Sequence, residues 1–294
     1  MSMVPKRVLI VGCGYVGTAL GRRLAAEGHS VVGLRRSAPD PMVVDDSGIQ
    51  PWIGDLTRRD SLESLPGPFD WVINTVSSSR GGPAEYRAVY RDGMRHLLDW
   101  MRTRPPTAFA YTSSTSVYGQ TSGEWVDESS PSIPSTETGG ILIETERLIL
   151  DAAAAGSVPG RILRVAGIYG PGRGHLLQQF LKGEARIQGT GARWINMIHR
   201  DDAAGALIAA LSNGRPGEIY NAVDDEPVSQ LDFLTWLSGR LQRPLPPVAT
   251  AEELASRKRG LTHKRVRNRK LRTETGWTPS YPTFREGYAA EVNR

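Results

Sequence analysis

The segment that most constrains the fold runs from residue 7 to residue 37. Its first residues, Arg7–Gly12, are an apolar run rich in β-branched side chains, which predicts a buried strand. Gly-Cys-Gly-Tyr-Val-Gly follows at once at positions 12–17, and a helical spacing of apolar residues then extends to Gly28, a typical helix C-terminal cap. A second strand is predicted over Ser30–Leu34. Strand, glycine turn, helix and strand in this order predict a βαβ unit that binds a dinucleotide.

Each glycine of this turn has a physical role. Gly12 permits a tight turn, Gly14 has no Cβ and lets a pyrophosphate approach the backbone, and Gly17 lets the helix pack closely on the strand. The N–H groups of Tyr15 and Val16 lie at the positive end of the helix dipole, which favours phosphate. We therefore predict that these five residues contact the cofactor. A glycine-rich turn that only packs is the alternative.

The residues after the second predicted strand indicate which cofactor binds. They are Arg35, Arg36 and Ser37, whereas an NAD site usually has an acidic residue here, bonded to the ribose 2′-OH. The nearest acid is Asp40, which lies beyond a proline. Two guanidiniums and a hydroxyl suit a 2′-phosphate instead. We predict NADP as the cofactor, with NAD as the second choice, and solvated surface arginines as the alternative reading.

Composition places the chain among globular proteins of one large domain or two modest ones. It has 294 residues, of which 39% are hydrophobic and 23% are charged, with a net charge of +5. No apolar run is long enough to span a membrane, so no membrane partner is predicted. Cys13 is the only cysteine, which excludes an internal disulfide and fits a reducing cytoplasm. No His, Cys, Asp and Glu cluster has the spacing of a metal site.

Strands and helices go on alternating after the first unit. The predicted strands are 49–54, 71–76, 108–113 and 161–169, and the predicted helices are 60–65, 86–101 and 141–152. This pattern predicts an α/β fold with a Rossmann-type doubly wound parallel sheet. We predict a dinucleotide-binding domain over residues 1–171, to which 195–223 returns. Residues 172–194 and 224–294 are expected to form a smaller C-terminal subdomain on the substrate side.

Six further segments carry a resemblance to a known family. They are Asp55–Leu56, Thr112–Gly119, Arg164–Gly172, Ile198–Asp202, Gly217–Asn221 and Asn268–Trp277. In order and spacing the chain resembles the extended and atypical branches of the short-chain dehydrogenase/reductase superfamily, often described as NAD-dependent epimerases/dehydratases. The resemblance implies that Asp55 and Leu56 contact the adenine. It implies further cofactor contacts for Thr75, Val76, Ser77, Thr112, Val165 and Ile168.

The chain departs from this family at the catalytic helix. Family members carry Tyr-x-x-x-Lys there, whereas this chain has Thr138 in place of the tyrosine and Leu142 in place of the lysine. Ser114 matches the family's catalytic serine. Thr138 stays a candidate because it keeps a hydroxyl, although an aliphatic hydroxyl is a far weaker acid than a phenol. The candidates to replace the tyrosine are Tyr118, Tyr169 and His199.

His199 also has a structural interpretation, because it precedes Asp201, the predicted N-cap of a helix over 203–211. A basic segment spans Arg257–Arg272. Its simplest interpretation is a solvated face. A clamp on a small anionic substrate comes second, and nucleic-acid binding third because no RNA- or DNA-binding motif accompanies the charge.

Two classes of function therefore stay open. The first is an NADP-dependent oxidoreductase or epimerase-like enzyme that acts on a small molecule. The second is a non-catalytic sensor or regulatory protein that binds NADP. A homo-oligomer is compatible with either class.

Overall fold

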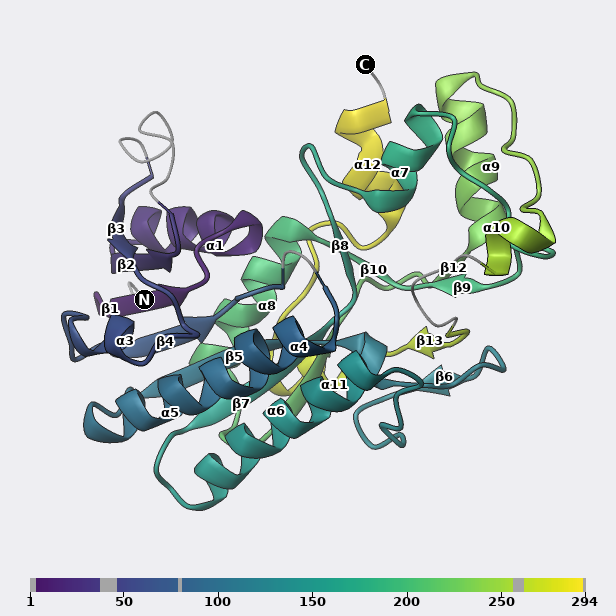
Figure 1. The fold of residues 1–294 in the computed structure, drawn as a ribbon. Helices are drawn as coiled ribbons and strands as arrows, with labels where there is room; N and C mark the ends of the chain where they lie inside the picture. Colours follow the sequence, from purple (N-terminus) through teal and green to yellow (C-terminus); the bar gives the residue numbers. More distant parts are fainter. Residues whose placement is uncertain (1–3, 38–46, 79–80, 256–261, 293–294) are drawn as a thin grey trace.

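The structure is a computed structural model that describes residues 4–37, 47–78, 81–255 and 262–292. Its centre is a seven-stranded parallel sheet with the order β11-β7-β5-β4-β1-β2-β3 (Figure 1). These strands are β1 (Arg7–Val11), β2 (Ser30–Arg35), β3 (Ile49–Ile53), β4 (Trp71–Asn74), β5 (Ala108–Ser114), β7 (Gly160–Val165) and β11 (Ile219–Ala222). The strand order reverses between β1 and β4, and such sheets bind ligands in the crevice at that point. The predicted Rossmann-type sheet is confirmed.

Helices cover both faces of the sheet (Figure 1). One face carries α1 (Tyr15–Ala26), α8 (Arg200–Asn213) and α11 (Arg269–Thr275); the other carries α3 (Asp60–Glu63), α4 (Pro83–Tyr86), the π-helical turn η1 (Arg87–Asp92), α5 (Gly93–Thr103) and α6 (Glu137–Ala154). Strand β1 contributes to both cores, with Val8 and Ile10 on the first face and Leu9 and Val11 on the second. Because both faces are buried, this strand is a continuous apolar run.

A smaller lobe lies beside the sheet (Figure 1). It contains α7 (His175–Leu181), α9 (Gln230–Leu241), α10 (Ala251–Ala255) and α12 (Phe284–Val292). Its core is aromatic: the rings of Phe233 and Phe284 lie 5.2 Å apart and almost perpendicular. Two short strand pairs outside the main sheet complete this side, β9 (Trp194–Ile195) with β12 (Val228–Ser229) and β6 (Trp125–Val126) with β13 (Arg265–Val266). The assignment of residues to two domains stays a prediction.

Two local predictions were wrong. Residues 161–169 do not form one strand, because β7 ends at Val165 and β8 (Gly167–Tyr169) leaves the sheet to pair with β10 (Met197–His199). Helix α8 begins one residue before Asp201, and its N-cap is His199, whose Nδ1 accepts the N–H of Asp201 at 3.2 Å. Asp201 lies instead in the first turn, where a negative charge favours the helix dipole.

Within the part of the chain that the structure describes, no helix has both the length and the apolar character needed to cross a membrane.

Candidate functional site

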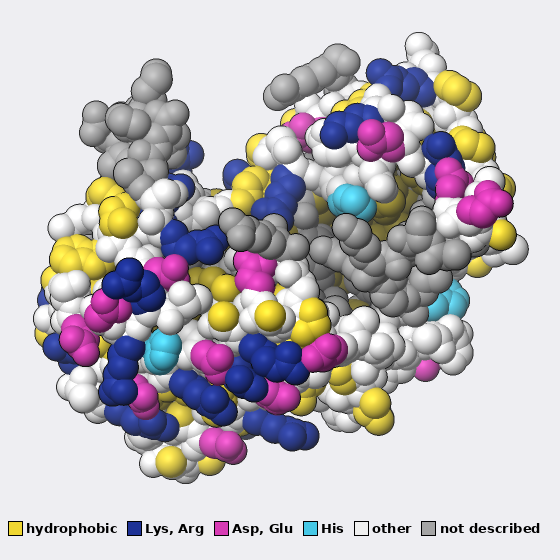
Figure 2. Space-filling model, in the orientation of Figure 1, with side chains coloured by type: hydrophobic (Ala, Val, Ile, Leu, Met, Phe, Trp, Pro, Cys, Tyr) yellow, Lys and Arg dark blue, Asp and Glu magenta, His cyan; other side chains and the backbone are white. Residues whose placement is uncertain are grey.

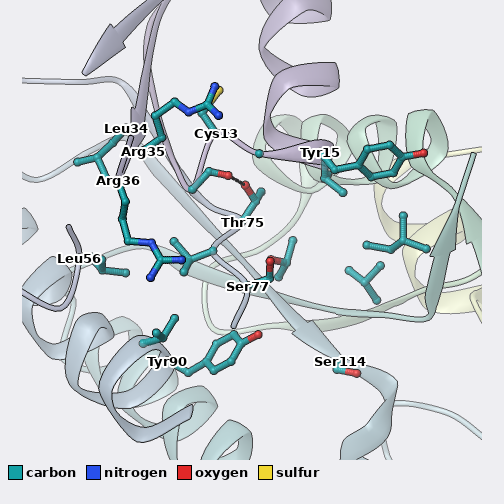
Figure 3. A pocket seen from close by; sticks show the side chains of 18 of the residues that line it. Cys13, Tyr15, Leu34, Arg35, Arg36, Leu56, Thr75, Ser77, Tyr90 and Ser114 are labelled. Atoms are coloured by element: carbon teal, nitrogen blue, oxygen red, sulfur yellow. Dashed lines mark hydrogen bonds between the residues drawn. The ribbon is translucent and has the colours of Figure 1, made fainter. Parts of the chain in front are cut away.

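A cavity of about 430 Å³ lies at the carboxyl ends of β1, β2, β4 and β5 (Figure 3). All but one of the residues predicted to contact a cofactor line it, and the exception is Gly17. The cavity therefore brings together the glycine turn, the residues after β2, the Asp55–Leu56 pair and the ends of β4, β5 and β7. Ser114 is the one candidate catalytic residue that lines it. This is the crevice in which a doubly wound sheet binds its ligand.

The three glycines of the turn differ in what the fold demands of them. Gly12 has φ +85°, and a Cβ there would lie 2.6 Å from the backbone nitrogen of Val76. A Cβ on Gly17 would lie 2.8 Å from the carbonyl oxygen of Gly12. By contrast, a Cβ on Gly14 would meet nothing nearer than that same oxygen, at 3.8 Å. Packing explains Gly12 and Gly17, whereas the open space at Gly14 lies on the cavity side, where a pyrophosphate fits.

One end of the cavity is basic. Arg35 ends β2, and Arg36 follows it along the cavity wall (Figure 3). Ser37 also lines the cavity. Among the described lining residues the only acid is Asp55, whose Oδ1 accepts hydrogen bonds from the N–H and the hydroxyl of Thr57, at 2.9 and 2.8 Å. Asp40 lies outside the described residues. The position after β2 thus presents cations and a hydroxyl to a ligand.

Ser114 stands at the other end of the cavity, at the last position of β5. Its Oγ accepts the N–H of Ser116 at 3.1 Å and so caps the 3-10 turn Thr115–Val117. Because this bond uses the oxygen as an acceptor, the hydroxyl can still donate its hydrogen to a ligand oxygen.

A buried ion pair between Glu146 and Arg164 contacts the end of β5 through Ser113. Glu146 on α6 accepts the Ser113 hydroxyl at 2.6 Å and two hydrogen bonds from Arg164 on β7, at 3.1 and 2.7 Å. Both charged side chains are almost fully buried. The Arg164 guanidinium also lies 4.8 Å from the ring centroid of Tyr118. This network ties α6, β5 and β7 together, and it reaches the cavity through Ser113.

The positions of the family's tyrosine and lysine offer no acid and no cation. Thr138 does not line the cavity, and its Oγ1 lies 3.2 Å from that of Thr136, the N-cap of α6. Leu142 is buried in an apolar cluster that includes Val117 and Val266.

The three residues that could replace the tyrosine also lie outside the cavity lining. The Tyr118 hydroxyl is buried and donates to Asn221 Oδ1 at 2.9 Å, and burial raises its pKa. The Tyr169 ring stacks on Tyr288 at 4.3 Å, and burial raises its pKa also. Burial lowers the pKa of His199, which caps α8. Tyr118, Tyr169 and His199 therefore pack in the structure and do not face the cavity.

The cavity also contains residues that the sequence reasoning missed. Tyr90, Ser113 and Arg173 all line it. Arg173 could have been suspected, because it directly follows Arg164–Gly172, one of the segments that carry the family resemblance, and its guanidinium lies 5.0 Å from the Tyr15 ring centroid. Tyr90 gave no such signal, because its helical spacing indicated a core-facing stripe. No group of three or more potential metal ligands occurs among the described residues.

Comparisons with known proteins agree with this geometry. The NAD dependent epimerase/dehydratase family matches residues 8–222. Protein YeeZ of Escherichia coli (strain K12) is 31% identical over 74% of this chain and 77% of its own length. The 3-diazoavenalumate denitrifying reductase of a Streptomyces species is 27% identical over 97% of this chain and all of its own length.

A solved structure gives the same result. A candidate NAD-dependent epimerase/dehydratase from Methylobacillus flagellatus is 34% identical, with a TM-score of 0.76 over 98% of this chain and 97% of the other. The family match covers the glycine turn, strand β5 with Ser114, and all of the parallel sheet except its first residue, Arg7. The chain therefore belongs to the NAD-dependent epimerase/dehydratase family.

Proposed function

We propose that this protein binds NADP(H) and is an NADP-dependent oxidoreductase, or an epimerase-like enzyme, that acts on a small molecule through a carbonyl or alcohol group. The observation that supports NADP most directly is the Arg35-Arg36-Ser37 run on the wall of the cavity, at the position where an NAD site has an acid. The reductase among the relatives supports the reaction class.

The residues present fit a dinucleotide. The open space at Gly14 and the N-terminus of α1, which has no acidic residue in its first turn, suit the pyrophosphate. Arg35, Arg36 and Ser37 would hold the 2′-phosphate, and Asp55 would contact the adenine. When bound, the nicotinamide supplies or accepts a hydride. Ser114 would hydrogen-bond the substrate oxygen and so polarise a carbonyl.

The charge of the substrate is a separate question. Positions 257–259 of the basic segment lie outside the described residues. In the described part, Lys270 pairs with Glu218 at 2.6 Å and Arg272 with Asp225 at 2.8 Å. The Arg265 guanidinium lies 5.0 Å from the ring centroid of Trp125 and 5.1 Å from that of Trp194. These contacts favour a structural role over a clamp on an anionic substrate, so we propose only that the substrate is small.

A non-catalytic NADP sensor is the second candidate. It is favoured by Thr138 and Leu142, since neither can do the work of the family's tyrosine and lysine. Absorbance at 340 nm, recorded with NADPH and a panel of aldehydes, ketones and quinones, separates the two candidates. The enzyme predicts oxidation of NADPH that depends on one class of carbonyl and on enzyme concentration. Tight NADPH binding without turnover on any carbonyl would favour the sensor.

The cofactor preference should depend on the arginines after β2. We expect Arg35→Ala/Arg36→Ala to weaken NADP⁺ binding about 10- to 100-fold and to leave NAD⁺ binding within about threefold. The reason is that a charge-assisted hydrogen bond contributes about 1.5–3 kcal/mol and only NADP⁺ has the 2′-phosphate. Isothermal titration calorimetry of the wild type and the double variant with each nucleotide measures these changes in affinity.

A matched control is Arg58→Ala, which removes an exposed arginine that pairs with Asp60 and does not line the cavity. It should leave both dissociation constants unchanged. Equal losses of NADP⁺ and NAD⁺ affinity in the double variant would show that the arginines do not read the 2′-phosphate.

A further inference from the structure

Arg173 is a cavity residue to which the proposed function gives no role. It lies in the connection between β8 and α7, where the chain enters the smaller lobe, and it lines the cavity. Its side chain is exposed. The other cations among the described lining residues are Arg35 and Arg36, which the proposed function places at the 2′-phosphate. A third cation, on a different segment, raises the question of which further anion the cavity holds.

The loop that carries Arg173 is held against the glycine turn. Gly170 and Arg173 exchange two backbone hydrogen bonds, at 2.9 and 2.8 Å, and so close a tight turn. The hydroxyl of Tyr15 donates to the carbonyl oxygen of Pro171 in this turn, at 3.2 Å. Tyr15 is the first residue of α1 and follows Gly14 directly. The loop is thus tied to a residue that forms the proposed diphosphate site.

The guanidinium of Arg173 contacts the ring of the same tyrosine. It lies 5.0 Å from the centroid of the Tyr15 ring. A cation–π contact uses the face of the ring and no hydrogen-bond acceptor, so the N–H donors of the guanidinium stay available. The contact also restricts the side chain before a ligand arrives, so binding costs it less conformational entropy.

Arg200 offers a direct comparison, since its guanidinium lies 5.1 Å from the centroid of the same ring. Unlike Arg173, it pairs with a carboxylate, that of Asp201, at 2.8 Å, and it does not line the cavity. Two arginines therefore share the Tyr15 ring, and Arg173 is the one that faces the cavity.

In the part of the chain that the structure describes, no carboxylate pairs with Arg173 and no carbonyl oxygen accepts a hydrogen bond from its guanidinium. Other exposed arginines have such a partner. Figure 2 shows dark-blue and magenta side chains next to one another over the helices at the lower left, and on α5 Arg102 pairs with Asp99 at 2.8 Å. The one described acid of the cavity wall, Asp55, lies just after β3 and holds Thr57. An unpaired cation on a cavity wall attracts an anionic part of the ligand.

The geometry indicates which anion this is. Figure 3 shows the Tyr15 ring extending from the start of α1 away from Arg35 and Arg36. Because Arg173 contacts this ring, its guanidinium lies beyond the glycine turn from the two arginines that would hold the 2′-phosphate. A dinucleotide that starts at these arginines and crosses the glycine turn brings its diphosphate to this place, with the phosphate of the nicotinamide ribose farther from the adenine.

We propose that Arg173 binds the diphosphate of the cofactor, at the phosphate of the nicotinamide ribose. This inference rests on the proposed function. The backbone N–H groups at the start of α1 would hold the diphosphate on one side and the guanidinium of Arg173 on the other. A guanidinium gives two parallel N–H···O bonds to one phosphate, which a compact ammonium cannot do. Arg173 thus recognises the part that NADP and NAD share, whereas Arg35 and Arg36 recognise the part in which they differ.

The test is a calorimetric titration of the wild type, Arg173→Ala and Arg200→Ala with four nucleotides. NADP⁺, NAD⁺ and 2′-phospho-ADP-ribose contain the whole diphosphate, whereas adenosine 2′,5′-bisphosphate lacks the phosphate on the nicotinamide side. We expect Arg173→Ala to bind the first three about tenfold more weakly, the lower end of the range for a charge-assisted hydrogen bond, because the side chain is exposed. Binding of adenosine 2′,5′-bisphosphate should change less than about threefold.

Arg200→Ala is the matched control, because it removes a guanidinium from the same ring and leaves the cavity lining unchanged. Its four dissociation constants should stay within about threefold of the wild type, as expected for an exposed ion pair. An Arg173→Ala variant that binds NADP⁺ as tightly as the wild type would overturn the proposal. An equal loss for adenosine 2′,5′-bisphosphate, or an equal loss in Arg200→Ala, would overturn it too, since neither variant would then report on the nicotinamide-side phosphate.

Salt separates the charge of Arg173 from its packing. The Debye length falls from about 10 Å at 0.1 M to about 3 Å at 1 M salt, so the tenfold ratio of the NADP⁺ dissociation constants of Arg173→Ala and wild type should shrink to about threefold. A ratio that salt leaves unchanged would show that Arg173 acts by packing on Tyr15, which contradicts the proposal. Melting temperatures check that the variants are folded.

Failure of this proposal can be told apart from failure of the proposed function. If the wild type binds none of the four nucleotides, the cavity is not a dinucleotide site and both are overturned. If the wild type binds NADP⁺ and Arg173→Ala raises only the KM of a charged carbonyl substrate from the panel, Arg173 binds the substrate. In that case the diphosphate proposal alone is overturned.

Discussion

A valine at position 14 is expected to abolish dinucleotide binding, with a loss of affinity of at least 100-fold, while the protein still folds. A Cβ on Gly14 meets no protein atom closer than 3.8 Å. The added side chain therefore costs the fold little and occupies the space that a pyrophosphate needs at the helix N-terminus. Calorimetry with NADPH and circular dichroism measure the two parts of this expectation.

The control is a glycine that has open space but lies far from the cavity. Gly239 in α9 is such a residue, because a Cβ there meets nothing within 4 Å. Gly239→Val should leave the dissociation constant unchanged. Wild-type affinity in a folded Gly14→Val variant would show that the cofactor does not bind at this turn.

Removing the buried carboxylate of Glu146 is expected to lower the free energy of unfolding by about 3–5 kcal/mol, because the Arg164 guanidinium would be left buried without its partner. Urea unfolding of Glu146→Ala measures this. The control is Glu144→Ala, two residues earlier on α6, where an exposed carboxylate faces Arg91 at 3.5 Å. Exposed pairs of this kind contribute less than about 1 kcal/mol. Equal losses in the two variants would mean that the buried network does not stabilise the end of β5.

Much of the sheet could be predicted because local patterns decide it. The apolar run of β1 is buried on both faces, and the glycine turn after it permits few conformations besides the strand–helix connection that is observed. The same reasoning failed for residues 161–169, which were predicted to form one strand. Apart from Arg161 and Arg164 this segment is an apolar run, and only its pairing with β10, more than 25 residues later in the chain, shows that β8 leaves the sheet.

The cavity was predictable to a similar degree, and for a similar reason. Motif residues such as Gly14, Arg36 and Ser114 can be recognised from the order and spacing of the motifs along the chain, and each lines the cavity. Tyr90 could not be recognised, because the helical spacing of apolar residues is the same for a side chain packed in the core and for one that lines a cavity. Its position in the cavity follows only from the tertiary structure, which brings η1, the segment after β4 and the end of β5 together.

The central claim is that this cavity is an NADP site, and the most direct test is the ratio of two dissociation constants of the wild-type protein. Isothermal titration calorimetry with NADP⁺ and with NAD⁺, in the same buffer and at the same salt concentration, gives this ratio. The arginines after β2 predict that NADP⁺ binds about 10- to 100-fold more tightly. Equal affinity, or tighter binding of NAD⁺, would contradict the account.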